Sequence, residues 1–207
     1  MELRDALTQI AEIRQQVART ELFRGYRALP VAFSGIAAFA AAGAQALWIP
    51  QPEQNISAYL ALWVGAALLS MFATGWEIVW RLRRGGGPLE REKAIVAVTQ
   101  FLPCVAAGAV LMIVLVRFAP ESLWMLPGLW AMLFGLGIFA SWRFLPHAVV
   151  WVGVFYLIAG SFCLAWAQGE AAFSPWAMGL PFGIGQLLAA AVLYWTLERT
   201  DDKRQEE

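Results

Sequence analysis

Long apolar segments alternate with short polar ones along most of the chain. A helix needs about 20 mainly apolar residues to cross the hydrocarbon core of a membrane. Six segments meet this requirement, and they lie near Pro30–Ile49, Ser57–Arg81, Ala94–Phe118, Leu123–Ser141, Leu145–Ala167 and Pro175–Leu197. The pattern predicts an all-α integral membrane protein, with six transmembrane helices in one bundle over residues 30–198.

Composition supports this class and leaves little room for another domain. The chain has 207 residues, of which 60% are hydrophobic and 14% are charged, whereas soluble domains average about 25% charged residues. The six apolar segments use most of the length, so no separate soluble catalytic domain is expected.

The segment before the first span, residues 1–29, is polar and has a helical stripe. Its apolar positions recur every three or four residues, a spacing typical of a cytoplasmic or interfacial amphipathic helix; they are Leu3, Ala6, Ile10, Ile13, Val17 and Thr20. Two interpretations stay open. Either residues 3–27 join this chain to another copy or to a partner protein, or they lie on the membrane surface or fold against the cytoplasmic ends of this chain.

Basic residues are distributed unevenly between the two sides of the predicted bundle. All but one of the 15 Lys and Arg residues fall in residues 1–29, 81–93, 143 and 199–207, and the exception is Arg117. Lys and Arg collect in short cytoplasmic segments, so both termini, including the charged tail 199–207, are predicted to be cytoplasmic. The first 29 residues do not resemble a secretory or organellar leader, which favours a bacterial plasma (inner) membrane. The formal net charge of zero gives no reason to expect nucleic acid as a partner.

Short motifs recur in the same order in the two halves of the chain. Leu29 and Pro30 are repeated as Leu126 and Pro127, Trp63-Val64-Gly65 as Trp151-Val152-Gly153, and Leu102 and Pro103 as Leu180 and Pro181. Three spans leave the chain on the opposite side of the membrane, so a three-span unit repeated once must be inverted. The motifs suggest a 3+3 inverted-topology repeat, an arrangement found in many transporters.

Candidate functional positions inside the spans are few. Pro103 and Pro181 are expected to kink the third and sixth spans, and kinks in matching positions of two halves mark binding sites in some transporters. Gln186 follows a glycine-rich stretch and is the better ligand candidate of the two glutamines within spans, the other being Gln45. Helix packing alone also explains these features.

Charged and titratable candidates lie near the predicted cytoplasmic side. Glu77 precedes Arg81 by four residues, a spacing suited to an ion pair on one helix. His147, the only histidine, lies in a short turn close to Arg143. Structural and catalytic zinc sites take at least three protein ligands, so we expect no metal site and no cofactor.

Cysteine and tryptophan positions fit a membrane bundle. Cys104 and Cys163 are expected to be too far apart for a disulfide. Most of the 11 tryptophans lie near span ends, as in an aromatic belt, while Trp63, Trp130 and Trp151 are expected to lie deeper.

No combination of residues indicates a reaction. A nucleophile–base pair and a Gly-x-Ser-x-Gly element are both missing, and we expect a protein that is not an enzyme. The favoured interpretation is a membrane subunit or sensor module that acts through protein–protein contacts in the lipid bilayer. The alternative is a small transporter or channel for a neutral or apolar solute, built from inverted three-helix repeats.

Overall fold

The computed structural model describes residues 28–84, 88–142 and 145–198. The expected amphipathic helix over residues 3–27, the tail and Arg143 lie outside these residues. Within the described ranges the chain forms helices joined by short turns and contains no strand.

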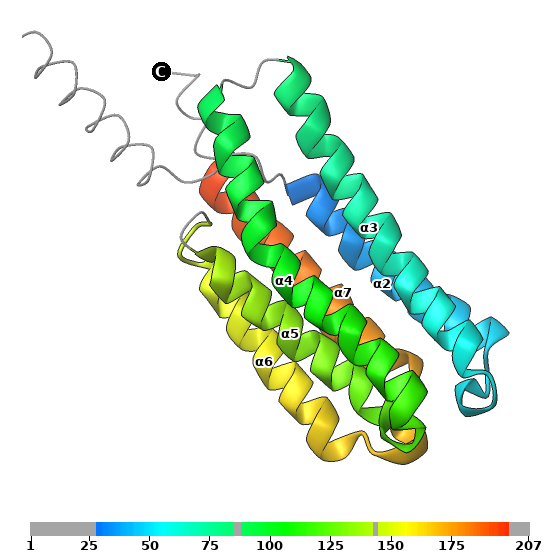
Figure 1. The fold of residues 1–207 in the computed structure, drawn as a ribbon. Helices are drawn as coiled ribbons and strands as arrows, with labels where there is room; N and C mark the ends of the chain where they lie inside the picture. The colour runs from blue at the N-terminus through cyan, green and yellow to red at the C-terminus, as the bar shows by residue number, and fades with distance from the viewer. Residues whose placement is uncertain (1–27, 85–87, 143–144, 199–207) are drawn as a thin grey trace, which may run out of the picture.

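Six α-helices form the body of the molecule (Figure 1). They are α2 (Ala28–Trp48), α3 (Ile56–Arg84), α4 (Pro88–Phe118), α5 (Leu126–Ser141), α6 (Val149–Trp166) and α7 (Pro175–Leu193). All six lie in segments that are long and apolar enough to cross a membrane. The described residues therefore confirm an all-helical fold with six helices that are long and apolar enough to span a membrane.

Short helices follow several of the long ones. Three are 3₁₀-helices at one end of the bundle, and the fourth is a π-helical turn that continues α7; they are η1 (Pro52–Gln54), η2 (Pro120–Met125), η4 (Gly169–Phe173) and η5 (Tyr194–Glu198). We call the end that holds η1, η2 and η4 the 3₁₀ end. The opposite end, which carries Arg83, Arg84 and Arg91, is the arginine end.

Proline fixes several helix starts. Pro88 and Pro175 are the first residues of α4 and α7, a position where the missing N–H costs nothing because it has no partner within the helix. At α7 the Ser174 hydroxyl also accepts a hydrogen bond from the Trp176 N–H. The fifth span begins at Val149 and not at Leu145 as expected. Pro146 disfavours helical geometry at the residue before it, and residues 145–148 form a turn.

The helices pack in an uneven way. α2 lies along α7, α5 lies along α6, and α4 rests on α5, whereas α3 contacts mainly α2. Among the described side chains of α3, only Tyr59, Trp63 and Ile78 are buried. Tyr59 and Trp63 are both close to the 3₁₀ end, so α3 is joined to the bundle mostly at that end.

Glycine allows the two tightest helix pairs to approach. A Cβ atom on Gly160 of α6 would lie 2.6 Å from the Gly128 carbonyl oxygen of α5, and one on Gly128 would lie 2.8 Å from the Gly160 carbonyl oxygen. Between α2 and α7, a Cβ atom on Gly35 would lie 3.0 Å from the Gly183 carbonyl oxygen. Close backbone packing of this kind is what holds helices together in lipid, where burial of apolar side chains gives no net gain.

Two groups of buried side chains form the interior. One, around Val152, Tyr156 and Ile138, lies in the half nearer the arginine end; the other, around Ala42, Trp63 and Leu126, lies nearer the 3₁₀ end. Phe182 of α7 packs against both groups, so a single apolar core runs the length of the bundle.

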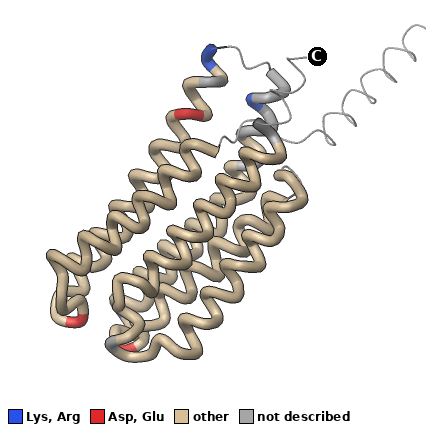
Figure 2. Tube along the Cα trace, turned by 180° about the vertical axis from the view of Figure 1, so that it is seen from behind, with Lys and Arg blue, Asp and Glu red and all other residues tan. Residues whose placement is uncertain are grey.

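Charged residues lie at the two ends of the described bundle, and the span between them is free of charge (Figure 2). Exposed tryptophans also lie toward both ends, among them Trp48, Trp166 and Trp176 at the 3₁₀ end and Trp80 and Trp195 at the arginine end. This distribution matches a membrane-embedded bundle with aromatic residues at its two interfaces.

Candidate functional site

A glutamine within α2 joins three parts of the molecule. The side chain of Gln45 is fully buried. Its Nε2 donates to the Phe173 carbonyl oxygen of η4 at 2.6 Å, and its Oε1 accepts from the Trp63 Nε1 of α3 at 2.7 Å. An indole N–H can only donate and a carbonyl can only accept, so the two partners fix the orientation of the amide.

The surroundings of Gln45 explain why both bonds matter. A buried amide without partners is costly, because it has lost water and gained nothing in return. Here one side chain holds together the end of α2, the first half of α3 and the connection between α6 and α7. Gln45 is therefore a structural junction at the 3₁₀ end.

Tyr59 strengthens the same junction. It lies one turn before Trp63 on α3, and its ring packs edge-on against Phe173 with centroids 5.4 Å apart. The Tyr59 side chain is fully buried. Its hydroxyl has no hydrogen-bond partner among the described residues, so this ring contributes mainly by packing.

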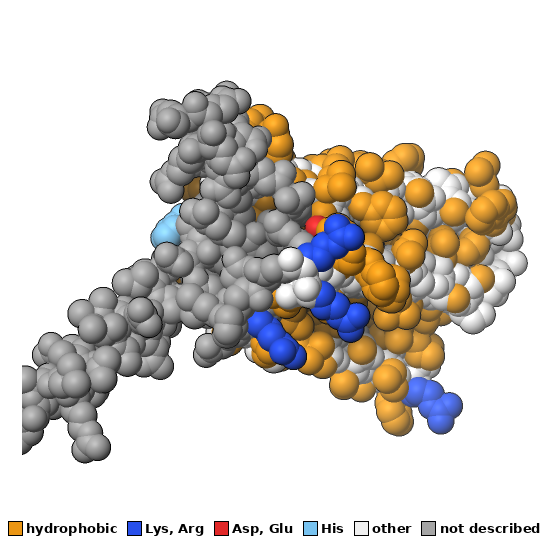
Figure 3. Space-filling view, turned by 90° about the horizontal axis from the view of Figure 1, so that it is seen from above, with side chains coloured by type: hydrophobic (Ala, Val, Ile, Leu, Met, Phe, Trp, Pro, Cys, Tyr) orange, Lys and Arg blue, Asp and Glu red, His pale blue; other side chains and the backbone are white. Residues whose placement is uncertain are grey.

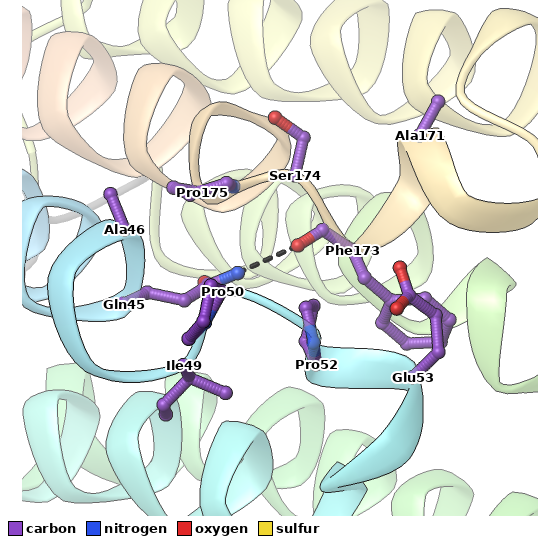
Figure 4. Close-up of a pocket in the computed structure, with 10 residues that line it drawn as sticks. All are labelled: Gln45, Ala46, Ile49, Pro50, Pro52, Glu53, Ala171, Phe173, Ser174 and Pro175. Carbon is purple, nitrogen blue, oxygen red and sulfur yellow. Dashed lines mark hydrogen bonds between the residues drawn. The ribbon is translucent and has the colours of Figure 1, made fainter.

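A pocket of about 510 Å³ lies directly beside this junction (Figure 4). It is bordered by the end of α2, by η1, by η4 and by the start of α7. The lining residues are Gln45, Ala46, Ile49, Pro50, Pro52, Glu53, Ala171, Phe173, Ser174 and Pro175. The volume falls within the range of about 300–1,000 Å³ that is usual for small-molecule sites.

The expected kinks of α4 and α7 do not border a common site. Pro103 is exposed on α4, whereas Pro181 is buried on α7. Between these helices lies a cluster of four aromatic rings from four helices, Phe101 of α4, Phe134 of α5, Tyr156 of α6 and Phe182 of α7, with neighbouring centroids 4.8 to 5.7 Å apart. These side chains fill the region where paired kinks would have suggested a cleft.

Gln186 lies on the half-buried side of α7, and its packing partner is α2. A Cβ atom on Gly35 would lie 3.2 Å from the Gln186 Cβ atom. Its side chain also approaches the Tyr156 hydroxyl, although the geometry does not make a hydrogen bond. Gln186 thus lies in the interface between α7 and α2. Gln45, which the sequence ranked lower as a ligand candidate, is the glutamine that lies beside the pocket and makes two side-chain hydrogen bonds.

The charged candidates lie at the arginine end and are not brought together into one site. Glu77 is half-buried on α3, and the side chain of its expected partner Arg81 lies outside the described part of the chain. His147 is exposed, and its ring meets the Trp142 ring edge-on at 6.0 Å. Its carbonyl accepts the Val150 N–H at 3.1 Å, at the start of α6. Among the residues that the structure describes, no group of three or more His, Cys, Asp or Glu could hold a metal ion.

Sequence reasoning missed the residues around the pocket. Glu53 and Phe173 fall in short connections, which gave no periodic signal, and Tyr59 was one aromatic residue among many. The two cysteines, Cys104 and Cys163, are free and half-buried. The Cys163 thiol lies 3.6 Å from the Ala177 carbonyl oxygen, as expected of a small packed side chain.

Comparison with protein-family models, curated proteins and solved structures finds no match for this chain. The function is therefore argued from the geometry of the chain itself.

Proposed function

We propose that this protein is a non-enzymatic membrane subunit that acts by binding another membrane-spanning helix along the outer face of α3. In this proposal the bundle lies in a bacterial inner membrane with both termini in the cytoplasm, so the arginine end is the cytoplasmic end. The distribution of Lys and Arg in the sequence supports this orientation.

The outer face of α3, opposite Trp63, carries the observation on which the proposal rests. Residues on this face follow alternating steps of four and three, the spacing of a helix–helix seam; they are Ala61, Gly65, Leu68, Phe72, Gly75 and Val79. Leu68 and Phe72 have 60% and 68% of their surface exposed. We call this set the α3 seam.

The two seam glycines differ from those of the packed helix pairs. A Cβ atom on Gly65 or Gly75 would meet no atom within 4 Å, whereas Gly35, Gly128 and Gly160 lie against neighbouring backbone. Small residues at seam spacing are what lets helices approach in lipid. A periodic seam of small and large residues that has no partner among the described helices supports a partner from outside this bundle.

The sides and the arginine end of the bundle offer two different kinds of surface to a partner. Hydrophobic side chains cover the sides, and several basic side chains gather at the arginine end (Figure 3). α3 has 29 residues and is therefore about 43 Å long at about 1.5 Å per residue, longer than the hydrocarbon core of about 30 Å. The excess, near Arg83 and Arg84, gives a partner a charged surface next to the membrane.

Native mass spectrometry of the protein, extracted gently from its own membrane, tests the proposal. We expect the wild type to retain a second chain, either a different protein or another copy. Gly65→Ile should release it, because a branched side chain prevents close approach. Gly43→Ile is the matched control, since Gly43 on α2 also has nothing within 4 Å. A wild type that is monomeric, or a Gly65→Ile variant that keeps its partner, contradicts the proposal.

A second candidate, a transporter built from inverted three-helix repeats, is favoured by the pairing of helices. In such a repeat, α2, α3 and α4 correspond to α5, α6 and α7. The α2–α3 contact then matches the α5–α6 contact, and the α2–α7 contact matches the α4–α5 contact. The α3–α4 contact matches the α6–α7 contact. Exchange of the two halves preserves these three pairs, although the contacts of α3 are the weaker ones and the contact between α5 and α7 has no comparable one between α2 and α4. Solute flux into liposomes that contain the purified protein distinguishes a transporter from a subunit.

A further inference from the structure

We propose that the pocket at the 3₁₀ end binds a small organic ammonium ion, with Glu53 as the group that holds its charge. This inference is independent of the proposed function, because it concerns the opposite end of the molecule from the arginines and requires no partner protein. It rests on the size of the pocket, its charge and the balance of hydrogen-bond donors and acceptors in its wall.

Glu53 is the charged residue of the pocket wall. It is exposed in the first turn of η1, and it has no ion pair with any described Lys or Arg. The sequence places one basic residue, Arg117, among the segments expected at this end, and Arg117 does not line the pocket. Among the described residues, the wall therefore has a net negative charge and no basic residue that balances it.

Donors in the wall are scarce. Pro50, Pro52 and Pro175 have no N–H group. The N–H groups of Ile49 and Ser174 already donate to the carbonyl oxygens of Gln45 and Ala171, at 2.8 and 3.2 Å. An anion or a ligand with only acceptors would find few free donors here.

Gln45 adds no accessible donor for a ligand, because its side chain is fully buried, even though one N–H of the amide has no hydrogen-bond partner among the described residues. Its amide is bonded on both sides, through Nε2 to Phe173 and through Oε1 to Trp63. The Glu53 carboxylate remains as the charged acceptor of the wall, whereas the Ser174 hydroxyl accepts the Trp176 N–H and points away from Glu53 (Figure 4). This balance favours a ligand that brings N–H donors and positive charge.

The remaining wall is apolar and suits the body of an organic cation. The side chains of Ile49, Pro50, Pro52 and Phe173 contribute to it, and an aromatic ring also attracts a cation through its face. A divalent metal ion fits poorly, because calcium takes six to eight oxygen ligands and magnesium six, and the wall supplies one carboxylate. An ammonium group on a compact hydrocarbon matches both parts of the pocket.

Isothermal titration calorimetry of the full-length protein in lipid nanodiscs tests the assignment, with empty nanodiscs as the reference. The probe is cyclohexylammonium, and cyclohexanol is its neutral counterpart of similar shape. We expect saturable binding of the ammonium and at least about tenfold weaker binding of the alcohol, since a hydrogen bond to a charged group is the stronger kind. Equal binding of the two probes, or no saturable binding of the ammonium, overturns the proposal.

Two substitutions locate the site. Glu53→Gln should weaken cyclohexylammonium binding at least about tenfold, since the charge-assisted bond is lost. Glu121→Gln is the matched control, because Glu121 also follows a proline in the first turn of a 3₁₀-helix at this end but does not line the pocket. Ala171→Leu, at an exposed position of the wall, should weaken binding by filling the pocket without changing its charge. Full affinity in Glu53→Gln, or displacement of the ammonium by stoichiometric Ca²⁺, overturns the proposal.

Discussion

Trp63 donates its indole N–H to the Gln45 side chain across 2.7 Å, and this bond connects α3 to α2 near the 3₁₀ end. α3 makes few other buried contacts with the bundle. This polar pair, together with the packing of Tyr59 on Phe173, therefore attaches α3 to the bundle at this end.

Replacing Gln45 should show how much this junction contributes to the free energy of unfolding. Gln45→Leu leaves the Trp63 N–H and the Phe173 carbonyl buried without their partner, and each such group costs about 1–3 kcal/mol. We expect a loss of roughly 2–4 kcal/mol in the free energy of unfolding, measured in detergent or bicelles by reversible unfolding. Gln51→Leu, at an exposed position of the same end, should change it by less than about 0.5 kcal/mol. Similar stabilities for the two variants would show that the junction is not important for folding.

The glycines of the α5–α6 pair should be intolerant of even one methyl group. In Gly160→Ala the new Cβ atom meets the Gly128 backbone at 2.6 Å, and overpacking of this kind costs about 1–3 kcal/mol. Gly43→Ala in α2, outside the α3 seam, serves as the control, because the added Cβ meets no atom within 4 Å and alanine is more favourable than glycine in a helix by up to about 1 kcal/mol. Thermal unfolding of the two variants should give shifts of opposite sign. A stable Gly160→Ala protein would mean that α5 and α6 can separate at little cost.

The sequence predicted the helices better than it predicted their faces. Six apolar runs gave six helices because a membrane requires long uninterrupted apolar segments. Trp151 was expected to lie deeper in its span than the tryptophans near span ends, yet it is the third residue of α6. Its surface is 74% exposed, whereas Trp63 is buried. Lipid and protein interior are equally apolar, so the sequence of a spanning helix shows only weakly which side faces its neighbours. The sequence ranked Gln186 above Gln45 as a ligand candidate without knowledge of their contacts, which come from distant segments of the chain.

The orientation of the bundle can be tested with cysteine labelling in intact cells. In a protein without Cys104 and Cys163, Glu53→Cys should react with a membrane-impermeant maleimide added outside, because the 3₁₀ end is proposed to face away from the cytoplasm. Arg84→Cys should react only after the cells are lysed. The reverse pattern would invert the topology and contradict the positive-inside argument.

The polar N-terminal segment yields a separate prediction about association. If residues 3–27 hold a partner or a second copy, deletion of residues 1–27 should dissociate the complex while the bundle remains folded. Native mass spectrometry gives the stoichiometry, and thermal unfolding verifies the bundle. An unchanged complex would leave the α3 seam as the contact and place these residues on the membrane surface or on the bundle itself.

The bond between Gln45 and Phe173 spans 128 positions of the chain, and this separation has a consequence for biosynthesis. Ribosomes add about 5–20 residues per second, so roughly 6–26 s pass between synthesis of the two partners. α2 also packs mainly against α7, the last of the six long helices to be made. During this interval α2 is in the membrane before α7, its main packing partner, has been synthesised. Of the two hydrogen-bond partners of Gln45, Trp63 is synthesised first. The order of synthesis thus makes α3 the first helix that can pack against α2 during membrane insertion, before α7 completes the bundle.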